Sequence, residues 1–92
     1  MKINIANTFK KAAKKLSKTH IALLEDAIEE ISKDVEIGEL KKGDLAGIRV
    51  YKFHIHSQLM LMAYIFEAPT LTLLSLSTHE NFYRDLKRKK IN

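Results

Sequence analysis

The sequence has no cysteine, and proline occurs only once and glycine three times in 92 residues. The absence of cysteine excludes a disulfide-stabilised scaffold, a zinc finger and thiol catalysis, and it fits a reducing cytoplasm. With 46% apolar and 29% charged residues, the composition is that of a globular chain rather than a disordered one. The length predicts a single domain that spans residues 1–92.

Long apolar runs are missing as well. The longest, Leu59–Phe66, is far too short to cross a bilayer, and the N-terminal stretch MKINIANTFK lacks the apolar core of a signal peptide. We therefore predict a cytoplasmic protein with no membrane contact. The sequence also contains no glycine-rich phosphate loop and no HExxH or GxSxG motif, so no motif by itself indicates an enzyme class.

Acidic residues are absent from the first twenty positions, which carry six lysines. Acidic residues gather in the middle of the chain and basic residues return near its C-terminal end, which gives a net charge of +5. This balance predicts an anionic partner, such as nucleic acid, an acidic protein or a membrane surface. For the N-terminal lysines alone, a solvated helix face is the simpler interpretation.

Two amphipathic helices are predicted after a short strand over Lys2–Ile5. Apolar residues recur at helical spacing over residues 9–16 and again over residues 21–35, with charged residues on the opposite side. The short link between them predicts an antiparallel helix hairpin. Gly38 is expected to end the helical region, and residues 39–47 are expected to form a loop.

The second half of the chain predicts three strands, over residues 48–55, 58–66 and 71–76. Short turns join them, which predicts an antiparallel meander. Because side chains alternate along a strand, Lys52 and His54 should face one side of the sheet and Arg49 the other.

The expected architecture is an α+β fold. The helix hairpin packs on one face of an antiparallel sheet, which consists of the short N-terminal strand and the three-stranded meander. A C-terminal helix after Thr78, with Phe82 and Leu86 toward the sheet, is expected to cover part of the opposite face.

Five residues could together support metal-free cleavage of RNA: His79, Tyr83, Arg84, Arg49 and Lys52. Such cleavage needs a base for the ribose 2′-OH, a donor or cation for the phosphorane and an acid for the 5′ leaving oxygen. Histidine serves as acid or base near neutral pH, tyrosine stacks on a base or relays a proton, and arginine binds phosphate through two parallel hydrogen bonds. His79 and Tyr83 lie four residues apart, so on a helix they share a face.

These residues also have structural interpretations. His79 could simply open the last helix, Tyr83 could be a core ring with its hydroxyl in water, and Arg49 could pair with a nearby carboxylate. His54 and His56 share a strand face, but no third ligand follows at a suitable spacing, so no metal site is predicted.

The whole chain resembles the RelE/ParE superfamily of bacterial toxins from type II toxin–antitoxin modules. The resemblance rests on the chain length and on the order of the helix hairpin, the run GDLAGIRVYKF, the apolar segment QLMLMAYIF and the C-terminal LLSLSTHENFYRDLKR. It implies a toxin that a cognate antitoxin binds and neutralises, in a hetero-oligomer that contacts operator DNA only through the antitoxin. It implies no cofactor.

The resemblance leaves the target of the toxin open. RelE-like members cut mRNA in the ribosomal A site without a metal, which would make this chain an endoribonuclease that acts on the ribosome and inhibits translation. ParE-like members inhibit DNA gyrase instead, and an inactive antitoxin-binding module is a third alternative. A histidine and a tyrosine near the C-terminus favour the nuclease branch.

The resemblance also assigns roles to individual residues. Arg49 falls at the strand position of a phosphate-binding arginine, His79 where nuclease members carry an acid or base, and Tyr83 where they carry a stacking or proton-relaying aromatic. These three are the candidate catalytic residues. The candidate substrate-binding residues are Lys52, Arg84 and His54.

Overall fold

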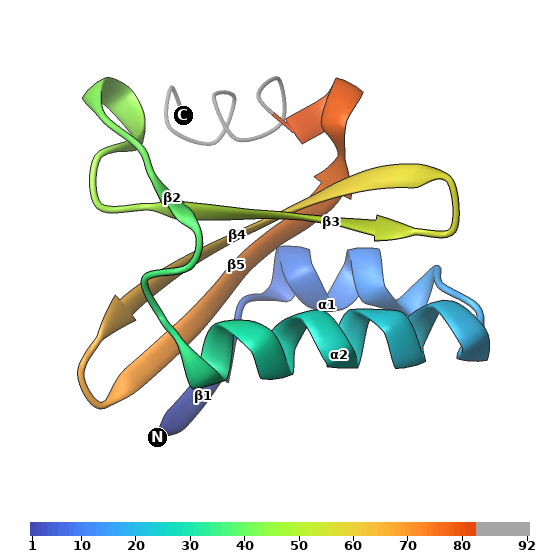
Figure 1. Ribbon diagram of the computed structural model, residues 1–92, viewed down its shortest axis with the longest axis horizontal. Helices are drawn as coiled ribbons and strands as arrows, with labels where there is room; N and C mark the ends of the chain where they lie inside the picture. The colour runs from blue at the N-terminus through green and yellow to red at the C-terminus, as the bar shows by residue number, and fades with distance from the viewer. Residues whose placement is uncertain (83–92) are drawn as a thin grey trace.

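The computed structural model of the chain describes residues 1–82, and it confirms the predicted α+β fold (Figure 1). The elements are β1 (Lys2–Ile5), α1 (Asn7–Lys14), α2 (Lys18–Lys33), β2 (Glu39–Leu40), the 3-10 turn η1 (Gly43–Leu45), β3 (Arg49–Ile55), β4 (Gln58–Glu67) and β5 (Thr70–Thr78). Residues 79–82 then open a further helical turn. The helices cover one face of the sheet, while η1 and the turn 79–82 lie on the other. The remainder of the predicted C-terminal helix, with Leu86, lies outside the described residues.

The five strands form one sheet in the order β1-β5-β4-β3-β2. The predicted meander is confirmed, since β3, β4 and β5 pair antiparallel, with Tyr51 opposite Met62 and Met62 opposite Leu76. β1 pairs with β5 in parallel, which makes the sheet mixed. β2 pairs with β3 inside the stretch 39–47, where the sequence predicts only a loop. That prediction is wrong because a two-residue strand carries no alternation to detect.

The second helix ends at Lys33, earlier than the predicted end of the helical region at Gly38. The Asp34 carboxylate accepts a hydrogen bond from the Glu36 amide at 3.1 Å, and the Asp34 carbonyl accepts one from the Ile37 amide at 3.0 Å. A side chain that offers the backbone local hydrogen bonds competes with helix formation, so the chain turns at this residue.

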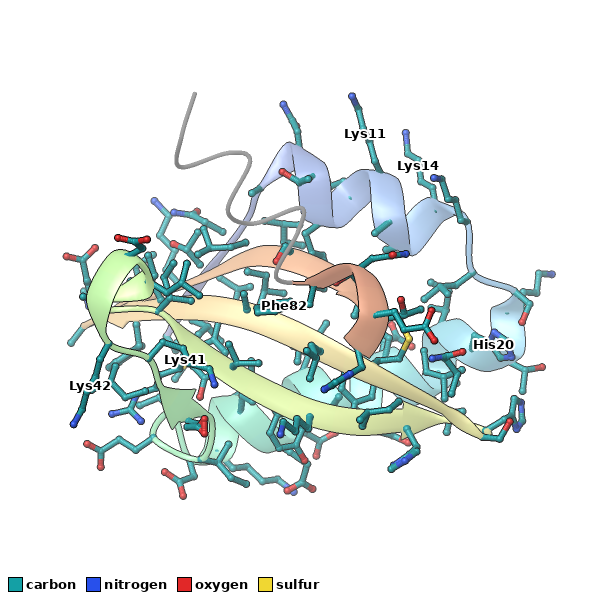
Figure 2. All side chains as sticks on the ribbon, turned by 90° about the horizontal axis from the view of Figure 1, so that it is seen from above. Lys11, Lys14, His20, Lys41, Lys42 and Phe82 are labelled. Carbon is teal, nitrogen blue, oxygen red and sulfur yellow. The ribbon has the colours of Figure 1, made fainter. Side chains whose placement is uncertain are left out.

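Apolar side chains fill both faces of the sheet. One cluster lies between the helices and the sheet and includes Phe9, Leu24, Ile31, Met62 and Tyr64. A second cluster lies on the other face and consists of Leu45, Ile48, Val50, Leu61, Ala63 and Phe82. Phe82 lies over the strands and is only 1% exposed, which confirms that it faces the sheet (Figure 2). β4 is buried between the two clusters, which explains its continuous apolar run.

The buried side chain of Tyr64 anchors the loop that follows α2. Its hydroxyl donates a hydrogen bond to the Val35 carbonyl oxygen at 2.8 Å and accepts one from the Gly38 amide nitrogen at 2.9 Å. A β-carbon at Gly38 would stand 2.7 Å from the Tyr64 hydroxyl oxygen, so a glycine is required for this close approach. Burial raises the pKa of Tyr64, which keeps the phenol protonated as a donor.

We expect Tyr64→Phe to lower the free energy of unfolding by about 1–3 kcal/mol, because it leaves the Gly38 amide and the Val35 carbonyl without their partner. Urea unfolding measures this difference. Tyr51→Phe is the matched control, since Tyr51 packs against the same core but is only partly buried. The control should change stability by less than about 0.5 kcal/mol. Equal losses in the two variants would contradict the anchoring role.

The raised pKa of Tyr64 also predicts how this stabilisation depends on pH. In the unfolded chain the phenol ionises near its usual pKa of 10.0, whereas the folded protein holds the proton to higher pH. The contribution is therefore complete below the unfolded-state pKa and is lost as the pH rises through the folded-state pKa. The difference in unfolding free energy between wild type and Tyr64→Phe should narrow above pH 10.0 in urea titrations. A constant difference would show that the phenol ionises at the same pH in both states.

Candidate functional site

His54 and His79 lie at the end of the sheet nearest the β3–β4 turn, and Lys52 lies at the middle of β3, in a pocket that Glu39 and Lys41 also line. Lys52 and His54 are exposed and share one face of β3, as predicted, and it is the face that the helices leave uncovered. β5 ends opposite Met60 of β4, and His54 stands opposite the neighbouring Leu59. The exposed His79, which follows β5 directly, therefore starts at the same end of the sheet as His54. We call Lys52, His54 and His79 the histidine end of the sheet.

The histidine end can bind an anion and transfer protons. An ammonium group attracts a phosphate, and an imidazole gains or loses a proton near neutral pH. β4 separates β3 from β5, and the usual strand spacing puts the backbones of these two strands roughly 10 Å apart. A ligand that contacts both His54 and His79 must therefore extend across β4. Two further residues of the predicted site, Tyr83 and Arg84, lie outside the described residues.

Arg49 does not join the histidine end, because it lies at the other end of β3 and on the helix-covered face. Its guanidinium donates hydrogen bonds from Nη1 to the Gly38 carbonyl at 2.9 Å and to the Glu36 carbonyl at 3.2 Å. Its Nη2 also lies 3.9 Å from the Glu36 carboxylate. In the structure, Arg49 therefore holds the loop after α2, beside the anchor that Tyr64 provides.

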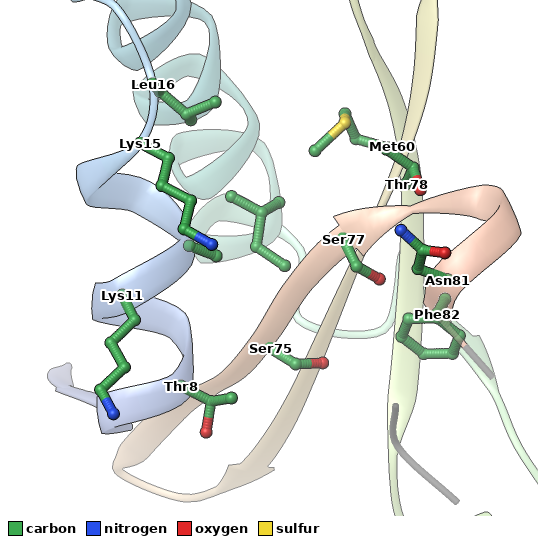
Figure 3. Close-up of a pocket in the computed structure, with 12 residues that line it drawn as sticks. Thr8, Lys11, Lys15, Leu16, Met60, Ser75, Ser77, Thr78, Asn81 and Phe82 are labelled. Carbon is green, nitrogen blue, oxygen red and sulfur yellow. The ribbon is translucent and has the colours of Figure 1, made fainter. Parts of the chain in front are cut away.

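A groove between α1 and β5, with a volume of about 370 Å³, opens next to the histidine end (Figure 3). Its lining includes Thr78 and Asn81, which flank His79 along the chain. From α1, Lys15 extends across the groove toward Ser77, and Lys11 lies at the rim one helical turn earlier. We call this feature the α1–β5 groove. The sequence shows six lysines near the N-terminus, but no signal in it distinguishes the two that line a groove.

Two serine hydroxyls in the floor of the α1–β5 groove have no hydrogen-bond partner within the described part of the chain. They belong to Ser75 and Ser77, and both oxygen atoms are buried. An unpaired buried hydroxyl costs free energy, so a ligand that reaches such a group and hydrogen-bonds to it is stabilised by that contact. The groove thus offers positive charge at its rim and unused polar groups in its floor.

Among residues 1–82, no three histidine, aspartate or glutamate side chains gather into a group that could hold a metal ion. Within the same residues, no helix has both the length and the apolarity that a membrane crossing requires.

Solved toxin structures share this fold. A YoeB/ParE toxin from Agrobacterium tumefaciens superimposes with a TM-score of 0.68 at 17% identity, over 86% of this chain and 99% of that one. A variant of the E. coli toxin RelE in the free state superimposes with a TM-score of 0.68 at 16% identity, over 95% of each chain. The archaeal RelE–RelB complex from Pyrococcus horikoshii superimposes with a TM-score of 0.54 at 14% identity, over 84% of this chain and 92% of that one. At such identities the likeness shows the fold alone.

The sequence itself shows the family. Residues 3–87 match the ParE-like toxin of the type II bacterial toxin–antitoxin system, so the chain belongs to this family. It is a type II toxin of the RelE/ParE superfamily, as the resemblance implied. A comparison with curated protein sequences gives no significant match.

The position of Arg49 predicts a loss of stability on its substitution. We expect Arg49→Gln to lower the free energy of unfolding by about 1.5–3 kcal/mol, because a charged donor of two loop hydrogen bonds is removed. Lys52→Gln removes the same charge from the same strand, and as an exposed substitution it should change stability by less than about 0.5 kcal/mol. Urea unfolding of the two variants measures the contrast. An Arg49→Gln protein as stable as wild type would mean that the loop does not depend on this side chain.

Proposed function

We propose that this toxin is a ribosome-dependent endonuclease that cuts mRNA in the ribosomal A site and so inhibits translation. The observation that carries the proposal is the histidine end of the sheet, where Lys52, His54 and His79 are each exposed. They supply a cation for the phosphate and imidazoles for proton transfer, which are the groups that metal-free RNA cleavage needs. The proposed location is the cytoplasm, where ribosomes and mRNA meet.

In the proposed reaction, His79 acts as the general base or the general acid. A base removes the proton of the ribose 2′-OH, the 2′ oxygen attacks the adjacent phosphorus, and the bond to the 5′ oxygen breaks as an acid protonates that oxygen. The products are a 2′,3′-cyclic phosphate and a 5′-hydroxyl. Lys52 and His54 bind the phosphate, and the charge of Lys52 stabilises the phosphorane. Tyr83 is proposed to stack on a base or relay a proton, and Arg84 to bind a phosphate.

We also propose a cognate antitoxin as the partner, in a hetero-oligomer that reaches operator DNA only through the antitoxin. Structural neighbours include the intact E. coli RelBE toxin–antitoxin complex and the archaeal RelE–RelB complex. The sheet edges offer apolar docking surface, since Ile3 and Ile5 on β1 are 44% and 42% exposed and Leu40 on β2 is 51% exposed. An antitoxin segment that pairs with an edge strand would cover these side chains.

Inhibition of DNA gyrase is the second candidate function. The match to the ParE-like family favours it, because the resemblance to ParE-like toxins implies gyrase as the target. In that case the histidine end carries no chemistry, and mRNA stays intact in arrested cells.

Primer extension of mRNA after brief expression of this chain alone tests the nuclease proposal. New 5′ ends in frame within translated codons are expected for wild type. His79→Ala should lose them, because removal of a general acid or base slows cleavage by about 10²–10⁴-fold. The control is His20→Ala, a histidine of α2 whose ring contacts His56 of the β3–β4 turn at a centroid distance of 4.9 Å and which has no proposed role, so this variant should keep the new ends.

The outcomes of this experiment separate the functions. Unchanged ends in a folded His79→Ala protein would remove His79 from the mechanism. Growth arrest with intact mRNA, together with loss of supercoiling by purified gyrase, would identify the gyrase inhibitor. Normal growth with intact mRNA would indicate an inactive antitoxin-binding module.

A further inference from the structure

The α1–β5 groove carries positive charge that no acid among its described lining residues balances. Lys11 lies on α1 and Lys15 is the residue that caps its C-terminal end in the same right-handed conformation, so at a spacing of four residues their β-carbons lie about 5–6 Å from each other. Among residues 1–82, none of the side chains that line the groove is acidic. Within residues 1–82, neither ammonium group takes part in an ion pair. Two adjacent cations without a counter-charge repel each other, and an anion placed between them removes that repulsion.

The rest of the lining is mostly apolar and has the character of a nucleotide site. Leu16, Met60 and Leu76 provide apolar surface beside the two lysines. The unpaired hydroxyls of Ser75 and Ser77 lie in the floor below. A nucleotide presents this combination, since it carries a charged phosphate, hydroxyl groups and the apolar face of a base.

We propose that the α1–β5 groove binds the backbone of single-stranded RNA, with Lys11 and Lys15 on its phosphates. The proposal rests on the proposed nuclease function and extends its site beyond the histidine end. Because Thr78 and Asn81 line the groove and flank His79, a strand held in the groove continues directly to His79. The groove thus fixes the RNA on one side of the bond that is cut.

An acidic protein segment is the competing ligand, and two features favour RNA. A nucleic-acid strand carries one charge in every repeat, so two lysines one helical turn apart can both reach a phosphate of the same strand. In addition, the groove adjoins the residues proposed to cleave RNA.

The experiment measures binding of a short fluorescent single-stranded RNA by anisotropy, without ribosomes. Its riboses carry 2′-O-methyl groups, so it cannot be cleaved and binding is measured separately from activity. The double variant Lys11→Gln/Lys15→Gln is compared with Lys10→Gln/Lys14→Gln, which removes the same charge from exposed lysines of α1 outside the groove lining. Circular dichroism checks that both variants remain folded.

The groove variant should bind the RNA at least about tenfold more weakly, whereas the control should lose less than about threefold. Loss of two phosphate contacts should also lower the slope of log affinity against log salt by about 1.4, at roughly 0.7 per contact on a single strand. Equal losses in the two variants would overturn the proposal, because only net charge would then matter. Absence of RNA binding by the wild type would overturn it as well.

Two further results separate this proposal from its alternatives. If a polyglutamate peptide of equal charge binds as tightly as the RNA and depends equally on Lys11 and Lys15, the groove is a general anion or peptide site and the assignment to RNA is wrong. If the wild type cleaves mRNA while Lys11→Gln/Lys15→Gln binds RNA normally, the groove proposal fails and the nuclease stands. If RNA binding depends on the groove but mRNA is never cut, the nuclease fails and the groove stands.

Discussion

The two hydrogen bonds of the Tyr64 hydroxyl join the helix layer to the edge of the sheet. They hold the backbone at Val35 and Gly38, where the chain leaves α2 and crosses to β2. The apolar cluster on the sheet face away from the helices depends on this connection between α2 and β2. The reason is that β2 leads directly into η1, whose Leu45 packs in that cluster. Arg49 reinforces the same loop through the Gly38 carbonyl. A buried hydroxyl group suits this position because it can donate a hydrogen bond and accept one at the same time. It therefore pairs a carbonyl and an amide that would otherwise lack partners.

The apolar cluster on the sheet face away from the helices determines where polar side chains of that face can be exposed. Leu45, Ile48 and Phe82 bury the part of the face around Val50 and Ala63. Among residues 1–82, the apolar cluster does not reach as far as the β3–β4 turn, and Lys52 and His54 are exposed. Polar groups cluster at that end because the apolar cover stops short of it. The chemistry proposed for His79 thus depends on an incomplete second core as much as on the histidine itself.

The sequence predicts the layers of this fold better than it predicts the site. Helical and strand periodicity are strong signals, so the hairpin, the meander and the two faces of β3 follow from pattern alone. The same alternation sets Arg49 on the opposite face from Lys52, which conflicts with a single cluster that contains both. The partner of Arg49 is a pair of loop carbonyls, and no side-chain pattern reveals where carbonyls lie. The two residues of β2 and the lysines that face the groove likewise depend on tertiary position.

The α1–β5 groove follows from the short length of β1. β1 pairs with β5 only as far as Leu73, and within residues 1–82 no other strand pairs with that edge of β5. The chain turns into α1 after Ile5, so a helix takes the place beside β5 that a longer strand would fill. Because a helix is much wider than a strand and offers no ladder of backbone groups, it cannot close against a strand edge as another strand does. The space left between them is lined by whichever α1 side chains face β5. In this chain Lys15, the residue after α1, points into that space and Lys11 lies at its rim, so the geometry that shortens β1 also leaves positive charge at the groove.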